Sequence, residues 1–297
     1  MPLNFNKFDK TSPKTAPLQC PICIGPVGLA ETNSILNFLF FLFEPNFFLI
    51  FEISCIIFTH ALFVNLKFKK PGPAMLTWEK SFDLFSNSEL LEYLRKFSLR
   101  ESETQKALRD QTNKLEESSW AVVPEQAQFL ALLAKIINAK MILEVGTFTG
   151  VSSLAMALAI EKDCKIITCD METKYTDIAQ RYWAEAKVDD KIELIIGPAL
   201  STLESLLDKY LEKFDLIFID ANKKDYVSYY EFGYQLVRKH GLIIFDNVLW
   251  DGKVINPNNN EKSTVAIQRL NSKLLHDDRV SISMLPINDG ITIAYKN

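Results

Sequence analysis

Histidine and cysteine are scarce in this chain of 297 residues, and those present are scattered. Of the three histidines, His240 and His276 stand alone, so the sequence supports no Ser/His/Asp or Cys/His pattern of a hydrolase. The five cysteines are an odd number in unlike segments, which argues against a disulfide framework and favours a reducing compartment. Cys20 and Cys23 have the spacing of half a zinc site, but no second pair and no nearby histidine completes it.

Excess positive charge is also lacking in most of the chain. Residues 1–74 carry six lysines and four acids, so of the total charge of −4 residues 75–297 carry −6. A net acidic domain lacks the broad basic surface of a nucleic-acid-binding protein. Residues 75–297 also show no repeats and no low-complexity tract, which indicates one ordinary globular domain.

The first 74 residues differ in composition from the remainder. They hold 12 of the 21 phenylalanines and 8 of the 12 prolines, which marks a domain boundary near residues 71–73. Residues 47–66 form an apolar run about long enough to cross a bilayer, and the lysines that follow favour a cytoplasmic side for the domain behind them. Two other readings stay open: a segment buried against the domain, or a stretch absent from the mature protein, which then starts at Met75. The chain is thus expected to be anchored by one N-terminal helix or to be a soluble cytoplasmic protein.

Beyond two lead-in helices at 86–97 and 101–118, strand-like and helix-like segments alternate. A third helix at 124–138 has Pro124 in its first turn and places Phe129, Leu132, Leu133 and Ile136 on one face. This alternation predicts a doubly wound α/β fold with a mostly parallel seven-stranded sheet and a C-terminal antiparallel hairpin turned by residues 288–290. The strands are expected at 141–145, 165–170, 191–196, 215–220, 242–246, 280–285 and 291–295, and the helices between them at 151–160, 174–186, 201–213, 226–237 and 264–276.

Two of the predicted strands end at acidic residues. Asp220 closes one apolar run, and Asp246 with Asn247 closes the next. Because ligands bind beyond the carboxyl ends of parallel strands, these three side chains are expected to meet at one edge of the sheet. Three hard oxygen donors there suit a divalent cation such as Mg²⁺ or Ca²⁺.

A glycine-containing turn follows the first strand. Glu144, Gly146 and Gly150 belong to the segment EVGTFTG, and Asp170 ends the next strand, where a carboxylate can accept both hydroxyl hydrogens of a ribose. Together they indicate a nucleoside-containing cofactor, although the two glycines alone could serve helix packing. The segment lacks the GxGxxG spacing of a dinucleotide site, and residues 75–297 contain no Tyr-x-x-x-Lys, which argues against a nicotinamide-dependent oxidoreductase. The cofactor favoured is S-adenosylmethionine.

Several motifs from 123 to the C-terminus resemble those of the cation-dependent class I O-methyltransferases. The group includes caffeoyl-CoA O-methyltransferases, their bacterial and cyanobacterial relatives, and animal catechol-O-methyltransferase-domain proteins. The resemblance covers nearly all of residues 75–297 and none of residues 1–74, and it implies the Rossmann-like fold of class I methyltransferases. The motifs are VPEQAQFL at 123–130, EVGTFTG at 144–150, GPALSTLESLL at 197–207, FDLIFIDANKKDY at 214–226, FDNVLWDGKV at 245–254 and LPINDGITIAYK at 285–296.

The resemblance also implies roles for individual residues. Lys223 matches the lysine proposed as general base. Asn222 departs from the family, which usually has Asp-Ala-Asp-Lys where this chain has DANK, so its cofactor contact loses a charge. The implied cofactor-binding residues are Val122, Glu144, Gly146, Thr147, Ser152, Asp170 for the ribose, Ala199 beside the adenine, and Asn222; the implied metal ligands are Asp220, Asp246 and Asn247.

The sequence therefore predicts a methyltransferase that carries S-adenosylmethionine and a divalent cation, Mg²⁺ ahead of Ca²⁺ or Mn²⁺. Its partner is expected to be a small hydroxylated acceptor, catechol-like or caffeoyl-like. The alternative acceptor is a hydroxylated uridine in tRNA, against which the acidic domain counts; the other alternative is a non-catalytic membrane-tethered module, which would be expected to lose Asp246, Asn247 or Lys223. The resemblance further implies a homodimer.

Overall fold

The structure is a computed structural model that describes residues 88–297. This part of the chain folds around one sheet, whose strands are β1 (Met141–Val145), β2 (Lys165–Asp170), β3 (Ile192–Ile196), β4 (Phe214–Ile219), β5 (Val237–Asp246), β6 (Val280–Leu285) and β7 (Ile291–Lys296). Their spatial order is β3-β2-β1-β4-β5-β7-β6. β1 to β5 are parallel, while β7 runs antiparallel to both β5 and β6. The predicted doubly wound sheet with a C-terminal hairpin is confirmed.

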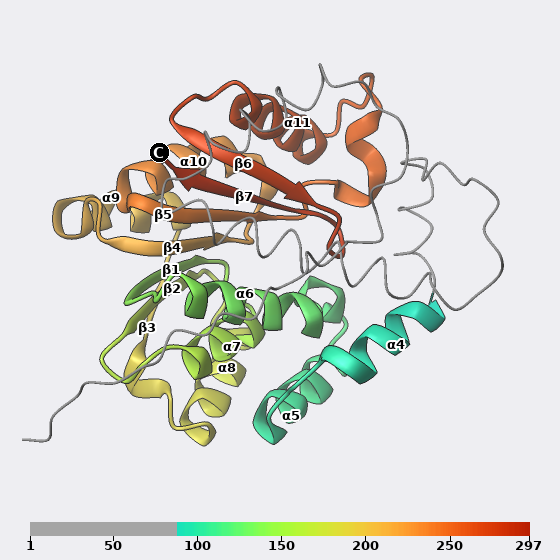
Figure 1. Cartoon of the computed structure of the whole chain (residues 1–297), viewed down its shortest axis with the longest axis vertical. Helices are drawn as coiled ribbons and strands as arrows, with labels where there is room; N and C mark the ends of the chain where they lie inside the picture. Colours follow the sequence, from blue (N-terminus) through green and yellow to red (C-terminus); the bar gives the residue numbers. More distant parts are fainter. Residues whose placement is uncertain (1–87) are drawn as a thin grey trace, which may run out of the picture. The chain divides into compact units, whose positions relative to one another are not determined.

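Helices cover both faces of the sheet because the strands are apolar on both faces (Figure 1). One face packs against α5 (Glu103–Thr112), α6 (Pro124–Ile136), α7 (Val151–Ala159) and α8 (Thr173–Glu185). The other packs against α9 (Ala199–Tyr210), α10 (Tyr226–Leu236) and α11 (Lys262–Leu275). The order of the strands reverses direction between β1 and β4, which is where open α/β sheets form their ligand crevice.

The register of the strands places several acidic side chains on one face. Glu144 on β1 is paired with Phe218 on β4, which is paired with Ile244 on β5. Paired residues project to the same face, and so do residues two positions further along. Phe218 and Ile244 belong to the core under α6 and α7, so that face also receives three acids at the carboxyl ends of their strands. They are Asp170, Asp220 and Asp246.

The lead-in helices differ from the sequence prediction. α4 (Ser88–Ser98) lies close to its predicted place, but α5 begins at Glu103 and ends at Thr112, well before residue 118. Its capping box is formed by Ser102 and Gln105, not by Ser98 and Glu101. Glu101 instead makes an ion pair of 2.9 Å with Arg109, which removes it from the helix terminus.

The buried face of α6 was also predicted only in part. Leu133 is buried as expected, but Leu132 is 51% exposed, and Phe129 is only partly buried. The face that α6 buries in the core shared with α7 contains two leucines, two alanines and one amide. The buried residues are Gln126, Ala127, Leu130, Leu133 and Ala134.

The predictions for the N-terminal segment concern residues that the structure does not describe. The apolar run at 47–66 and the alternative start at Met75 both lie outside residues 88–297. Within that range, none of the helices has the length and apolar character needed to cross a membrane.

Candidate active site

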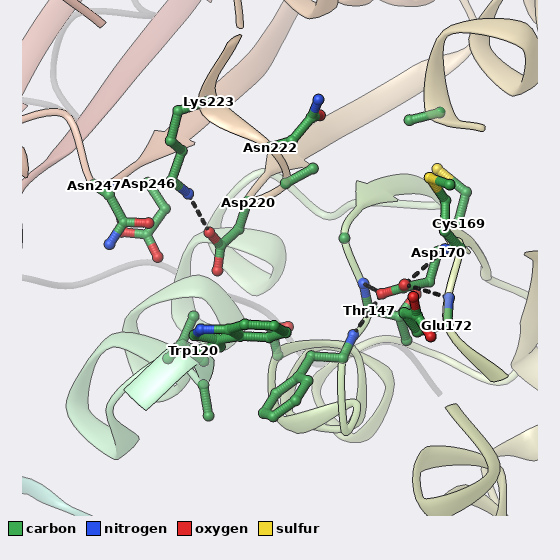
Figure 2. A pocket seen from close by; sticks show the side chains of 18 of the residues that line it. Trp120, Thr147, Cys169, Asp170, Glu172, Asp220, Asn222, Lys223, Asp246 and Asn247 are labelled. Atoms are coloured by element: carbon green, nitrogen blue, oxygen red, sulfur yellow. Dashed lines mark hydrogen bonds and ion pairs between the residues drawn. The ribbon is translucent and has the colours of Figure 1, made fainter. Parts of the chain in front are cut away.

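A cavity of about 770 Å³ lies at the carboxyl ends of β1, β2, β4 and β5. Figure 2 shows side chains that line it, most of which come from the loops that follow these strands, while Trp120 comes from the segment before α6. Of the residues predicted to bind cofactor or metal or to act as general base, all except Glu144 line this cavity. Those that do are Val122, Gly146, Thr147, Ser152, Asp170, Ala199, Asp220, Asn222, Lys223, Asp246 and Asn247.

Two glycines shape the turn between β1 and α7. Gly146 has a φ of 96°, and a Cβ there would lie 2.0 Å from the carbonyl oxygen of Asp220. The turn can therefore pass directly against the end of β4 only because position 146 has no side chain. Gly150, with a φ of 78°, is the N-cap of α7 and packs against Trp183 of α8. The tight turn that the sequence predicted is present.

Asp170 is held by backbone amides at the edge of the cavity. Its Oδ2 accepts hydrogen bonds of 2.8 Å from the N–H groups of both Thr147 and Phe148. Its Oδ1 accepts from Met171 at 2.7 Å and Glu172 at 3.0 Å. A carboxylate has about four lone-pair sites, so a ribose here would share oxygens that are already bonded. The ribose role of Asp170 stays a prediction.

Glu144 lies beneath the cavity and does not line it. It is completely buried, and its two carboxyl oxygens accept hydrogen bonds of 2.6 Å from Ser152 and Thr168. Burial raises the pKa of Glu144 to about 7, even though the hydroxyl groups favour the ionised form. Glu144 is joined to the cavity by this hydrogen bond from Ser152, which lines it, and its cofactor role stays a prediction.

Lys223 is paired with one of the predicted metal ligands. Its Nζ lies 2.8 Å from Oδ1 of Asp220 and donates to the hydroxyl of Tyr226, also at 2.8 Å. Tyr226 is fully buried and donates in turn to the main-chain oxygen of Asp246 at 3.0 Å. Burial alone would lower the pKa of Lys223, but Asp220 and Tyr226 together outweigh it and hold the pKa above its ordinary value. Lys223 is thus an ammonium ion in this arrangement.

Asp246 and Asn247 stand beside this pair. Asp246 is 2% exposed, and its Oδ1 accepts from the N–H of Asn247 at 2.7 Å. Burial, followed by the charge of Asp220, holds the pKa of Asp246 well above its usual range. Asn247 has a φ of 54°, a conformation that Asn tolerates better than most residues. Figure 2 shows these side chains converging from the ends of β4 and β5.

The donor set fits a hard divalent cation. The buried carboxylate of Asp246 and the partly buried carboxylate of Asp220 repel each other, and a cation bound between them would relieve that repulsion. Carboxylate and carboxamide oxygens are the ligands such ions prefer. In the described residues, no three or more His, Cys, Asp or Glu side chains are grouped to hold a metal. Because the predicted set has two acids and one amide, that finding does not test it.

Asn222 does not join the acidic cluster. Its Nδ2 donates to Asp225 at 2.6 Å, and its Oδ1 accepts from the hydroxyl of Tyr229. The amide points away from Asp220 in Figure 2. These two bonds tie Asn222 to the start of α10, so a cofactor contact from this side chain stays a prediction.

Sequence reasoning missed an aromatic wall of the cavity. Trp120, from the short helix at Ser118–Trp120, is 59% exposed and lines the cavity together with Phe148 and Tyr175. The ring centroids of Trp120 and Phe148 are 5.7 Å apart, and those of Phe148 and Tyr175 are 4.8 Å apart. The available signal was a tryptophan outside any apolar periodic run.

Comparison with known proteins identifies the family. The model of a family described as O-methyltransferase matches residues 95–297. Probable caffeoyl-CoA O-methyltransferase 2 of Dictyostelium discoideum is 44% identical over 213 residues, which is 71% of this chain and 92% of that protein. Catechol O-methyltransferase domain-containing protein 1 of Mus musculus is 38% identical over 211 residues, 71% of this chain and 80% of that protein.

Solved structures agree with this assignment. The O-methyltransferase TomG from Streptomyces achromogenes, in complex with SAM, superposes with a TM-score of 0.67 at 27% identity and covers 72% of this chain and 99% of its own. An O-methyltransferase from Bacillus cereus, in complex with SAH, also superposes with a TM-score of 0.67. It is 28% identical in sequence, and the match covers 72% of this chain and 100% of its own. The chain belongs to the O-methyltransferase family, as its motifs predicted.

Proposed function

We propose that this protein transfers a methyl group from S-adenosylmethionine to a hydroxyl of a small acceptor with vicinal hydroxyls, and that the reaction depends on a divalent cation. One observation carries the proposal: Asp220, Asp246 and Asn247 line the same cavity as the Gly146 turn and Asp170. A nucleoside-binding half and a cation-binding half thus face one space. The related proteins named for caffeoyl-CoA and catechol methylation support an acceptor of that class.

The nucleoside half would hold the methyl donor. S-adenosylmethionine, when bound, supplies an electrophilic methyl group on its sulfonium. The N–H groups of Thr147 and Phe148 fix Asp170, and Ser152 presents a hydroxyl anchored on Glu144. This rigid arrangement would orient the donor towards the acceptor, and orientation alone supplies much of the acceleration of a two-substrate reaction.

The cation half would prepare the acceptor. A phenolic hydroxyl has a pKa near 10, so little of it is ionised at neutral pH. The cation, held by Asp220, Asp246 and Asn247, would favour the ionised oxygen as a Lewis acid. To accept the proton, Lys223 must first be a neutral amine. The negative charge of Asp220 stabilises the ammonium form of Lys223 and opposes this. The base role of Lys223 therefore requires the Asp220 charge to be compensated by another cation.

Chelation tests the proposal directly. The full-length chain is incubated with labelled S-adenosylmethionine and a catechol, first with EDTA and then after Mg²⁺ is restored in excess. We expect transfer to stop with the chelator and to return with Mg²⁺. Transfer that is indifferent to the chelator would refute the cation dependence.

The same assay separates the acceptor classes. Catechol, caffeoyl-CoA and a tRNA carrying a hydroxylated uridine are compared at equal concentration. We expect the small acceptors to be methylated and the tRNA not, because the domain is acidic. Methylation of the tRNA alone would replace the proposed acceptor while leaving the chemistry intact.

A further inference from the structure

Gln126 is a buried amide whose hydrogen-bonding groups lack partners. It is 0% exposed in the first turn of α6, and among the described residues neither its amide nitrogen nor its oxygen makes a hydrogen bond. A buried unpaired amide costs free energy, so such groups are rare in folded proteins. Because the side chain does not line the cavity, water in the cavity does not supply the missing hydrogen bonds of the amide.

The position of Gln126 shows what it faces. α6 covers the face of the sheet to which Ile244 of β5 projects, and Asp246 projects to that face two residues later. The Gln126 amide also contributes to lowering the pKa of the Asp246 carboxyl, in agreement with the shared face of the sheet. The Oδ1 atom of Asp246 accepts a hydrogen bond from the N–H of Asn247. Oδ2 is therefore available to the amide.

A second glutamine on the same helix shows the contrast. Gln128 has both amide atoms paired: its Oε1 accepts from the N–H of Arg100 at 2.7 Å and its Nε2 donates to the carbonyl of Ser98 at 2.9 Å. Those bonds tie α6 to the segment between α4 and α5, which is a structural role. Gln126, two residues earlier, makes no such connection in the described structure.

We propose that Gln126 is a positioning residue for the cation site: when the ion binds, the amide N–H that is unpaired in the cation-free protein donates to Oδ2 of Asp246 and fixes that carboxylate for the ion. This inference rests on the proposed cation dependence and adds a residue to it. Residues that orient a metal ligand commonly contribute 10- to 100-fold to metal affinity. Neither Gln126 nor any other residue of α6 was among the metal-site residues predicted from the sequence.

Two measurements on one variant, the Tm and the Mg²⁺ affinity, separate a positioning role from a packing role. Gln126→Leu replaces the amide by an apolar group of similar size, so the cation-free protein should keep or raise its Tm, because an unpaired buried amide is removed. Mg²⁺ titrated calorimetrically into the full-length variant should bind about 10-fold more weakly or worse. The affinity for S-adenosylmethionine in EDTA should not change.

Gln128→Leu is the matched control. It should lower the Tm, since two hydrogen bonds to backbone are lost, and leave the Mg²⁺ affinity as in the unmodified protein. Unchanged Mg²⁺ affinity in Gln126→Leu, or a lower Tm with unchanged affinity, would overturn the inference and assign Gln126 a structural role. Should Gln126→Leu fail to fold, Gln126→Met repeats the test with a more flexible chain. Failure of the unmodified protein to bind Mg²⁺ would instead refute the cation dependence on which the inference rests.

Discussion

The two halves of the cavity satisfy their carboxylates in different ways. On the nucleoside side, Asp170 accepts four backbone N–H groups and Glu144 accepts two hydroxyls. On the cation side, Asp246 accepts the N–H of Asn247, and Asp220 accepts the ammonium of Lys223. The first half satisfies its carboxylates with its own hydrogen bonds, while the second holds one buried and one partly buried acid whose mutual repulsion is only partly compensated. The divalent cation that we propose would complete that compensation.

Replacing Asp246 by Asn should give the largest effect. It removes one of the two charged ligands proposed for the cation, and few other groups on that side could hold the ion in its place. We expect cation-dependent turnover to fall about 1,000-fold, close to 4 kcal/mol of transition-state stabilisation. Methyl-transfer rates at saturating Mg²⁺ measure it. The affinity for S-adenosylmethionine should stay within about threefold, because the nucleoside half keeps its own hydrogen bonds. Unchanged turnover would contradict the assignment of Asp246.

Gly146→Ala should break the contact that brings the two halves together. A Cβ would lie 2.0 Å from the backbone of Asp220 at a φ of 96°, so we expect a loss of at least about 3 kcal/mol in the free energy of unfolding. Gly252→Ala is the control: its φ is 71° but its Cβ would meet nothing within 4 Å. That variant should lose only about 1 kcal/mol from backbone strain. Urea denaturation measures both losses. If the two variants lose the same free energy of unfolding, the close approach of the chain after β1 to the end of β4 does not contribute to stability.

Glu144→Gln should change the pH dependence of stability on the nucleoside side. The folded pKa of Glu144 is raised from 4.5 to about 7, so the folded state binds the proton more tightly than the unfolded state. The stabilisation is fully present below pH 4.5 and is lost as the pH rises to about 7. The variant should therefore gain up to about 3 kcal/mol over the unmodified protein above pH 7, and nothing below pH 4.5. Urea denaturation in EDTA across that range measures it, and a pH-independent difference would count against the shifted pKa.

The smallest effect is expected at Asn222. Restoring the acid usual in the family, Asn222→Asp, would set two carboxylates against each other, since Asn222 now donates to Asp225 at 2.6 Å. We expect a loss of about 1 kcal/mol in the free energy of unfolding. Adding Asp225→Asn should recover most of it by reversing donor and acceptor. A double-mutant cycle that shows no coupling would indicate that this hydrogen bond contributes nothing to stability.

The sequence predicted the sheet well because buried parallel strands are long apolar runs that end at punctuating residues. β2 and β6 begin and end where the pattern placed them. Helix boundaries were less predictable: Ser98 and Glu101 have capping-box spacing, but the ion pair of Glu101 with Arg109 moved the cap to Ser102. The sequence offered two possible capping boxes, Ser98 with Glu101 and Ser102 with Gln105, and the ion pair of Glu101 favoured the second.

The candidate site could be predicted where a residue's role follows from its place at a strand end. Asp170, Asp220 and Asp246 are such residues, and they line one cavity. Gln126 and Trp120 could not be found in this way, because their roles depend on how α6 and the turn before it pack against the sheet. Periodicity favoured Leu132 for the buried face of α6, and the amide of Gln126 lies there instead.

Binding of Mn²⁺ to the full-length chain shows directly whether Asp220, Asp246 and Asn247 hold a divalent cation. Electron paramagnetic resonance counts the bound ions in the unmodified protein and in Asp246→Asn, without S-adenosylmethionine. We expect one Mn²⁺ per chain that Mg²⁺ displaces, and loss of that ion in the variant. No bound ion in the unmodified protein, or the same ion retained in Asp246→Asn, would contradict it.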